Sequence, residues 1–189
     1  TGIGYGALAT MDTDGNAYST AVGYFAGNST SSGVENTLFG AFAGDAITTG
    51  SYNTLYGIHA GGGLVGGGGN TAFGYSALKS EDGNGTNTAV GDEALFTLNA
   101  GADSYNVAVG HHASKLMTTG AENTIIGGLA GDALTTGAYN VAVGMEALST
   151  EDAHGKNTAI GYRALKTQDA GADGNNVAVG YNAGTNVTT

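Results

Sequence analysis

The residues best suited to chemistry in this chain are an acidic loop, three acidic pairs and one histidine pair. The loop at positions 12–16 reads Asp-Thr-Asp-Gly-Asn and is similar to the start of a calcium-binding loop. No glutamate follows at the spacing that would supply the distal bidentate ligand. An acidic surface turn is therefore the preferred interpretation, with calcium binding as the alternative.

The acidic pairs are Glu81-Asp82, Asp92-Glu93 and Glu151-Asp152. General acid–base catalysis needs two carboxyl groups in different environments within one cleft. Adjacent acids in loops are typical of a solvated surface, so no catalytic residue and no enzymatic activity are predicted. A polysaccharide-cleaving solenoid is the enzymatic alternative, and it would require a cleft lined with acids.

His111 and His112 are the other candidates for metal chemistry. Neighbouring residues of a strand point to opposite faces, so these two imidazoles are not expected to bind one ion. An exposed pair is the preferred interpretation, and no metal or cofactor is predicted.

Aromatic residues often follow a glycine that recurs along the chain. A column of such rings on a rod could bind a host glycan or surface protein. Packing against a neighbouring chain is the equally weighted alternative. The candidate binding residues are Tyr5, Tyr24, Phe25, Phe42, Tyr75, Tyr162 and Tyr181.

These candidates are positioned by a repeat whose marker is the recurring glycine. Successive markers are 17 or 19 residues apart, a period typical of solenoids. The markers are Gly4, Gly23, Gly40, Gly57, Gly74, Gly91, Gly110, Gly127, Gly144, Gly161 and Gly180. The sequence therefore predicts a single repeat domain over residues 1–189, built from about eleven coils.

The three residues before each marker predict a strand, as in Val141-Ala142-Val143. The first position is always Thr or Val, and the third is always β-branched or aromatic. These two positions share one face of a strand and are expected to fill the coil. The middle position, which is mostly Ala or Leu, is then expected to face another copy of the chain. This second apolar face is the argument from the residues for an oligomer.

Other positions of the repeat predict its turns. Asn stands four residues before most markers and is expected to form a side-chain ladder, while Ala stands three residues after every marker and predicts a tight inner corner. Seven residues before the marker, types such as Gly33, Gly50 and Asp103 predict a backbone with positive φ. A second short strand is expected after the glycine corner.

The motif Asn-Thr-Ala-Val-Gly-x-x-Ala resembles the head repeat of trimeric autotransporter adhesins. It is also similar to the repeats of phage tail-fibre-like proteins, which segments 75–78 (Tyr-Ser-Ala-Leu) and 162–165 (Tyr-Arg-Ala-Leu) match closely. The resemblance implies an all-β fold, a parallel β-solenoid of the left-handed β-roll type, packed as a homotrimer.

Composition narrows the range of partners. The net charge is −11 with only five basic residues, which argues against nucleic acid. No apolar run approaches the roughly 18 residues that a membrane span needs. We expect a structural segment of a longer extracellular fibre, on a cell surface or virion, that associates with itself.

Two binding functions are the alternatives to a structural role, ice binding and glycan binding. Ice binding would need a flat, exposed threonine array. Val107, Val141 and Val177 interrupt the threonine positions and favour burial instead.

Overall fold

The computed structural model describes residues 1–12, 17–83, 85–150, 153–168 and 174–187. Within these residues it is an all-β solenoid, as the repeat predicts, with one short strand in each coil. The strands are β1 (Gly2–Ile3), β2 (Thr20–Val22), β3 (Thr37–Phe39), β4 (Thr54–Tyr56), β5 (Thr71–Phe73), β6 (Thr88–Val90), β7 (Val107–Val109), β8 (Thr124–Ile126), β9 (Val141–Val143), β10 (Thr158–Ile160) and β11 (Val177–Val179).

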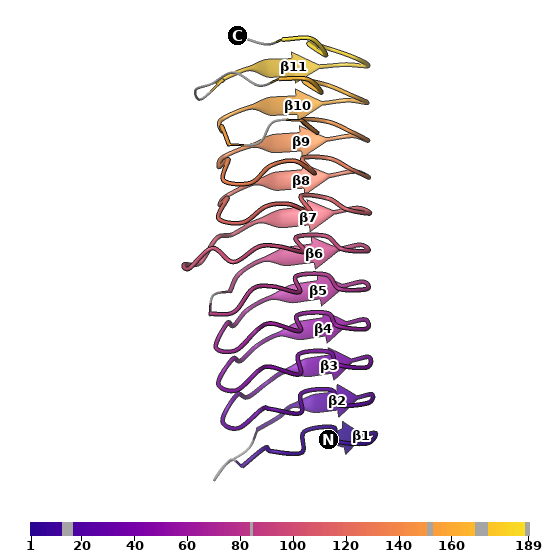
Figure 1. Cartoon of the computed structure of the whole chain (residues 1–189), viewed down its shortest axis with the longest axis vertical. Helices are drawn as coiled ribbons and strands as arrows, with labels where there is room; N and C mark the ends of the chain where they lie inside the picture. The colour runs from indigo at the N-terminus through magenta and orange to yellow at the C-terminus, as the bar shows by residue number, and fades with distance from the viewer. Residues whose placement is uncertain (13–16, 84, 151–152, 169–173, 188–189) are drawn as a thin grey trace.

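All eleven strands form one parallel sheet in sequence order. Equivalent residues of neighbouring coils are paired, so that Leu38 lies beside Leu55 and Phe39 beside Tyr56. Figure 1 shows the result, a straight ladder of strands that all point the same way. Because the register never slips, each position of the repeat becomes a column of side chains along the rod.

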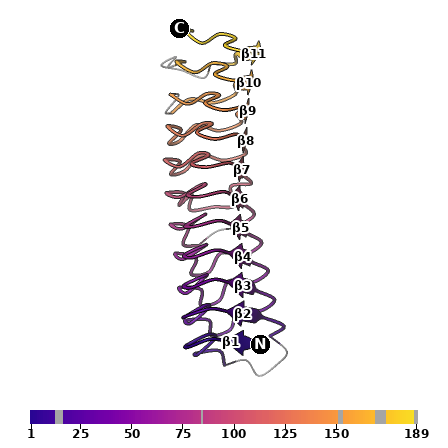
Figure 2. The same cartoon turned by 90° about the vertical axis from the view of Figure 1, so that its right-hand side faces the viewer.

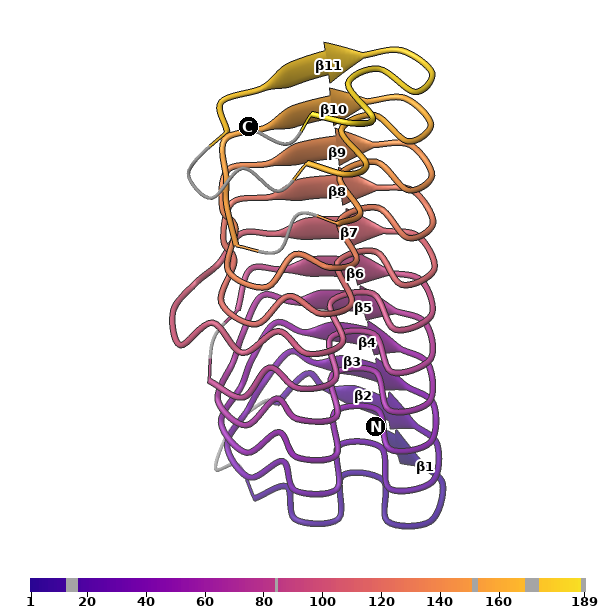
Figure 3. The ribbon, with the colours of Figure 1, turned by 45° about the horizontal axis from the view of Figure 1, so that its top comes forward.

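The strands occupy one side of the rod and the turns the other, as the side view in Figure 2 shows. In Figure 3 the strands run to the right along the far side, and the chain returns along the near side. Since the chain also climbs from β1 to β11, the coil is left-handed.

The expected second strand is wrong for the described residues, because the chain after each marker forms turns. Residues two and four positions after the marker have positive φ, including Phe42 and Leu78. Side chains at such positions strain the backbone, yet almost every coil repeats the same conformation. The turns after the marker are thus a fixed part of the coil.

The predicted turn position is also wrong. Positive φ occurs five residues before the marker, as at Glu35 and Tyr52, and not seven residues before it. Gly33 and Gly50 occupy the earlier position for a different reason. A Cβ atom on either would lie within 2.3 Å of a carbonyl oxygen of the next coil. Close stacking of coils, rather than backbone conformation, accounts for these glycines.

The marker glycines combine a positive φ with a close contact to the next coil. Gly57 has a φ of 140°, and a Cβ atom there would lie 2.3 Å from the carbonyl oxygen of Gly74. The same contact recurs from coil to coil. A side chain at this position would push neighbouring coils apart, which explains why the marker is always glycine.

The prediction for the two strand faces is wrong. The middle strand residues point into the coil, where Leu38 and Leu55 are no more than 1% exposed. The third strand residues point outward, and Phe39 and Tyr56 are 43% and 44% exposed. The threonines of β2–β5 are likewise exposed. The Ala and Leu column is therefore the core of each chain and not a contact between chains.

The core is filled by reciprocal side-chain sizes. In the coil of β4, Leu55 stands in the strand and Gly61 stands four residues after the marker. A Cβ atom on Gly61 would lie 2.7 Å from the Leu55 side chain. In the coil of β5 the sizes are exchanged: the small Ala72 stands in the strand, and the buried Leu78 stands four residues after the marker. Each of these rungs thus contributes one large side chain to the same volume, which explains how the core stays closely packed.

The predicted asparagine ladder is confirmed. Oδ1 of Asn36 accepts a hydrogen bond from the backbone N–H of Asn53 at 3.0 Å and another from Nδ2 of Asn53 at 3.1 Å. Nδ2 of Asn53 also donates to the carbonyl of Gly67 at 2.9 Å. Both asparagines are fully buried. The ladder therefore joins neighbouring coils through polar groups that have no access to water.

Candidate interaction face and histidine cluster

The largest candidate site is the strand side of the rod, which we name the outer face. It comprises the first and third residues of every strand, with the residues five positions before and one position after each marker. Of the large apolar side chains that are exposed in the described residues, all except Val65 and Leu116 belong to these positions. The exposed apolar surface is therefore concentrated on one side of the chain.

The strand columns of the outer face carry no charge. Their residues are Thr, Val, Ile, Phe and Tyr in β2–β11, and β1 contributes Ile3, although the chain has a net charge of −11. Eleven strands at about 4.8 Å spacing give a length of about 50 Å, and three residues at about 3.3 Å each give a width of about 10 Å, so the strand columns cover about 500 Å². A stable protein interface buries about 800 Å² on each partner. The strand columns therefore supply an uncharged centre for an interface, and the flanking columns of the outer face, which include Glu35, Asp92, Glu122 and Lys156, supply a polar rim.

Aromatic rings reinforce the third strand column. The rings of Phe39 and Tyr56 stack with centroids 4.6 Å apart, and those of Tyr56 and Phe73 stack at 4.7 Å. Sequence reasoning missed these three residues as surface groups because it assigned their column to the core.

The structure divides the seven predicted binding aromatics into three places. Tyr5, Tyr24, Phe25 and Phe42 form one cluster near the start of the rod, where Tyr5 and Tyr24 stack at 5.7 Å. The remaining three lie farther along the rod.

Tyr162 and Tyr181 stack at 5.1 Å near the other end of the rod. Tyr75 lies between the two clusters and is 52% exposed. The predicted residues therefore do not form one continuous ladder.

A charged cluster lies beside the outer face around Glu146. Its carboxylate accepts a hydrogen bond from Nε of Arg163 at 2.7 Å and also pairs with Nζ of Lys166. The hydrogen bond from Arg163 is the main cause that lowers the pKa of Glu146 to about 2. This cluster joins two adjacent coils by charge.

Glu93 occupies the same repeat position as Glu146, two residues after a marker. Nζ of Lys115 lies 2.5 Å from its carboxylate, and this hydrogen bond is the main cause that lowers the pKa of Glu93. His112 takes the place of the arginine, with Nε2 3.1 Å from Oε2 of Glu93. The two clusters therefore differ chiefly in the residue beside the lysine, which is Arg163 around Glu146 and His112 around Glu93.

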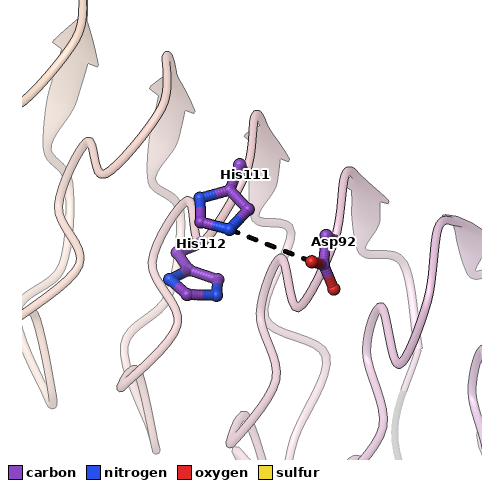
Figure 4. Close-up of side chains that lie close together, drawn as sticks. All are labelled: Asp92, His111 and His112. Atoms are coloured by element: carbon purple, nitrogen blue, oxygen red, sulfur yellow. Dashed lines mark ion pairs between the residues drawn. The ribbon is translucent and has the colours of Figure 1, made fainter.

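The expectation that His111 and His112 point to opposite faces is wrong. The two rings stack with centroids 3.7 Å apart. His112 has a φ of 55°, so the pair lies in a turn and not in a strand. Nε2 of His111 is 3.8 Å from Oδ2 of Asp92 in the preceding coil (Figure 4). One potential ligand atom from each of these three residues lies within 4.8 Å of the other two.

The other acidic candidates do not come together. Glu81 is fully buried, whereas its neighbour Asp82 is exposed. Glu151 and Asp152 lie outside the described residues, as do positions 13–16 of the calcium-like loop. The described part of the surface contains no pocket, and the described segments contain no helix that could cross a membrane.

Comparison of the chain with protein-family models, with curated proteins and with solved structures finds no match.

Proposed function

We propose that this chain is a structural segment of an extracellular fibre, on a cell surface or virion, and that it assembles with copies of itself through the outer face. The observation that carries the proposal is the uncharged, apolar strand face of a strongly acidic chain. An exposed apolar patch of this extent is typical of a protein interface. The resemblance of the repeat to fibre proteins supports the same function.

The geometry of the rod suits this role. Neighbouring coils are bonded through the sheet and, from β3 to β11, also through the ladder asparagines, so the segment is stiff along its axis. Since each column is regular, equivalent columns of a second copy can pack against it over the whole length. A closed homotrimer, in which each chain turns its outer face toward a common axis, would cover this surface on all three chains.

Charge substitution on the outer face tests the proposal. Tyr56→Lys with Phe73→Lys places two positive charges in the centre of the aromatic stack. We expect the double variant to sediment as a folded monomer, while the unmodified chain sediments as an oligomer. Val65→Lys and Leu116→Lys are matched controls, because both residues are exposed but lie off the outer face.

The two outcomes of this experiment are distinct. Loss of association only in the outer-face variant supports the proposed interface. Equal association of the outer-face variant and the controls would exclude the outer face as the contact.

Ice binding is the second candidate, and one observation favours it. The threonines of β2–β5 form a regular exposed column, contrary to the burial expected from the sequence. The bulky rings of Phe39, Tyr56 and Phe73 stand in the next column and disturb the flatness that ice contact requires. Thermal hysteresis measured on the unmodified chain separates the candidates, since the interface proposal predicts none.

Glycan binding is supported by the stacked rings of Tyr162 and Tyr181, of which Tyr162 is half-buried and Tyr181 is exposed. Stacked rings at the end of a rod offer apolar surface to a sugar ring. A glycan array probed with the unmodified chain and with Tyr181→Ala tests this alternative, which predicts binding that is lost in the variant.

A further inference from the structure

We propose that Asp92, His111 and His112 form a binding site for a divalent transition-metal ion, with Zn²⁺ as the fitting ion. Imidazole nitrogen and carboxylate oxygen are ordinary zinc ligands, and three protein ligands leave one coordination position open. All three ligands belong to one chain, so the site needs no residue of a second copy, although Asp92 and His111 lie in a flanking column of the outer face.

The positions of the three side chains follow from the coil. Asp92 and His111 occupy equivalent places, one residue after successive markers, and stacking of the coils brings them side by side (Figure 4). His112 joins them because its positive φ turns the chain back beside His111. The site therefore combines two rungs of the solenoid.

The distances require only a small movement. Zinc bonds of about 2.0–2.1 Å place tetrahedral ligand atoms about 3.3 Å apart. His111 and Asp92 are already at 3.8 Å, and all three ligand atoms lie within 4.8 Å of one another. The side chains of Asp92 and His111 are 48% and 57% exposed, so both can rotate without disturbing the core. Rotation of the stacked rings would direct both lone pairs toward one ion.

The surroundings favour a cation. Glu93 lies 3.1 Å from Nε2 of His112, where a carboxylate can hold one ring nitrogen as a donor and leave the other for the metal. Asp132 is close enough to His112 for their charges to interact. Lys115 is the nearby cation, and it is paired with Glu93. With a chain charge of −11, the average field also attracts positive ions.

Titration of the full chain with Zn²⁺ by calorimetry, in a buffer that does not bind metals, tests the site. We expect one Zn²⁺ per chain and no comparable heat with Mg²⁺, because Mg²⁺ prefers oxygen ligands. His111→Gln and Asp92→Asn should each weaken binding at least tenfold. Glu93→Gln should weaken it by about 10–100-fold through the orientation of His112.

His59→Gln is the matched control, since His59 also lies two residues after a marker but stacks on Phe42 at 5.0 Å. It should leave zinc binding unchanged. Imidazole NMR signals should show that Zn²⁺ shifts His111 and His112 and leaves His59 in place. Absence of binding, or equal binding by the His111, Asp92 and His59 variants, would overturn the proposal.

Discussion

The inner and outer faces of the same strands are both apolar, yet only the inner face is covered by the chain itself. In β4, Leu55 is fully buried, whereas its neighbour Tyr56 is 44% exposed. In most coils the inner residue is matched in size to the residue four positions after the marker, although Ala21 is accompanied by Gly27 and Ala108 by Ser114. The outer column varies freely between valine, isoleucine and aromatic rings. The inner residues, whose sizes are mostly matched, pack within the chain. The outer residues, which are uncharged but vary in size, form a surface that another molecule can cover.

Truncation of the inner face should give the largest effect. We expect Leu55→Ala to lower the free energy of unfolding by about 2–5 kcal/mol, because it opens a cavity in a closely packed core. Urea denaturation of the full chain at fixed concentration measures the change.

The same substitution can be compensated if sizes are truly reciprocal. Adding Gly61→Leu to Leu55→Ala reproduces the pairing of Ala72 with Leu78 and should restore most of the lost stability. If the double variant is less stable than Leu55→Ala alone, the two positions do not fill the same volume of the core.

Removal of an asparagine from the inner ladder should have the next largest effect. Asn53→Ala leaves the backbone N–H of Asn70 and the carbonyl of Gly67 without these bonds inside the rod. We expect a loss of about 1–3 kcal/mol. Asn99→Ala, at an exposed position, is the comparison that should change stability little.

The charged clusters beside the outer face should respond to pH. The pKa of Glu146 is about 2 against an ordinary 4.5, so its contribution to stability is fully present above pH 4.5. This contribution is lost as the pH falls through about 2. Melting curves between pH 6 and pH 2 should show a smaller decline for Glu146→Gln than for the unmodified chain. An identical decline in both proteins would show that the ion pairs of Glu146 do not contribute to stability.

The smallest effect is expected for threonine on the outer face. Thr54→Val should change stability by less than about 0.5 kcal/mol and should not reduce association, because valine already occupies this column in β7, β9 and β11. Loss of association in Thr54→Val would show that the threonine hydroxyls, and not the apolar rings, make the contact.

Much of the fold could be predicted from the sequence because the repeat constrains it. The marker glycines, the strand before each one and the buried asparagines all follow from residue type and spacing. Apolar character could not predict which face of each strand is buried, because both faces are apolar. One signal was present, the reciprocal exchange between Leu55 with Gly61 and Ala72 with Leu78, which places the middle strand position inside.

The candidate sites were less predictable than the fold. The stacked Phe39, Tyr56 and Phe73 were assigned to the core together with their strand face. The His111–His112 cluster depends on a positive φ at a histidine, and the residue type gives no indication of it. The position within the repeat does, because the residue two places after most markers adopts this conformation.

The most direct test of the central claim is the mass of the unmodified chain in solution, measured by sedimentation equilibrium over a range of concentrations. If the outer face packs against copies of the same chain, the mass should be a whole multiple of the chain mass, with three chains as the expected assembly. A single-chain mass at every concentration would contradict self-association through the outer face.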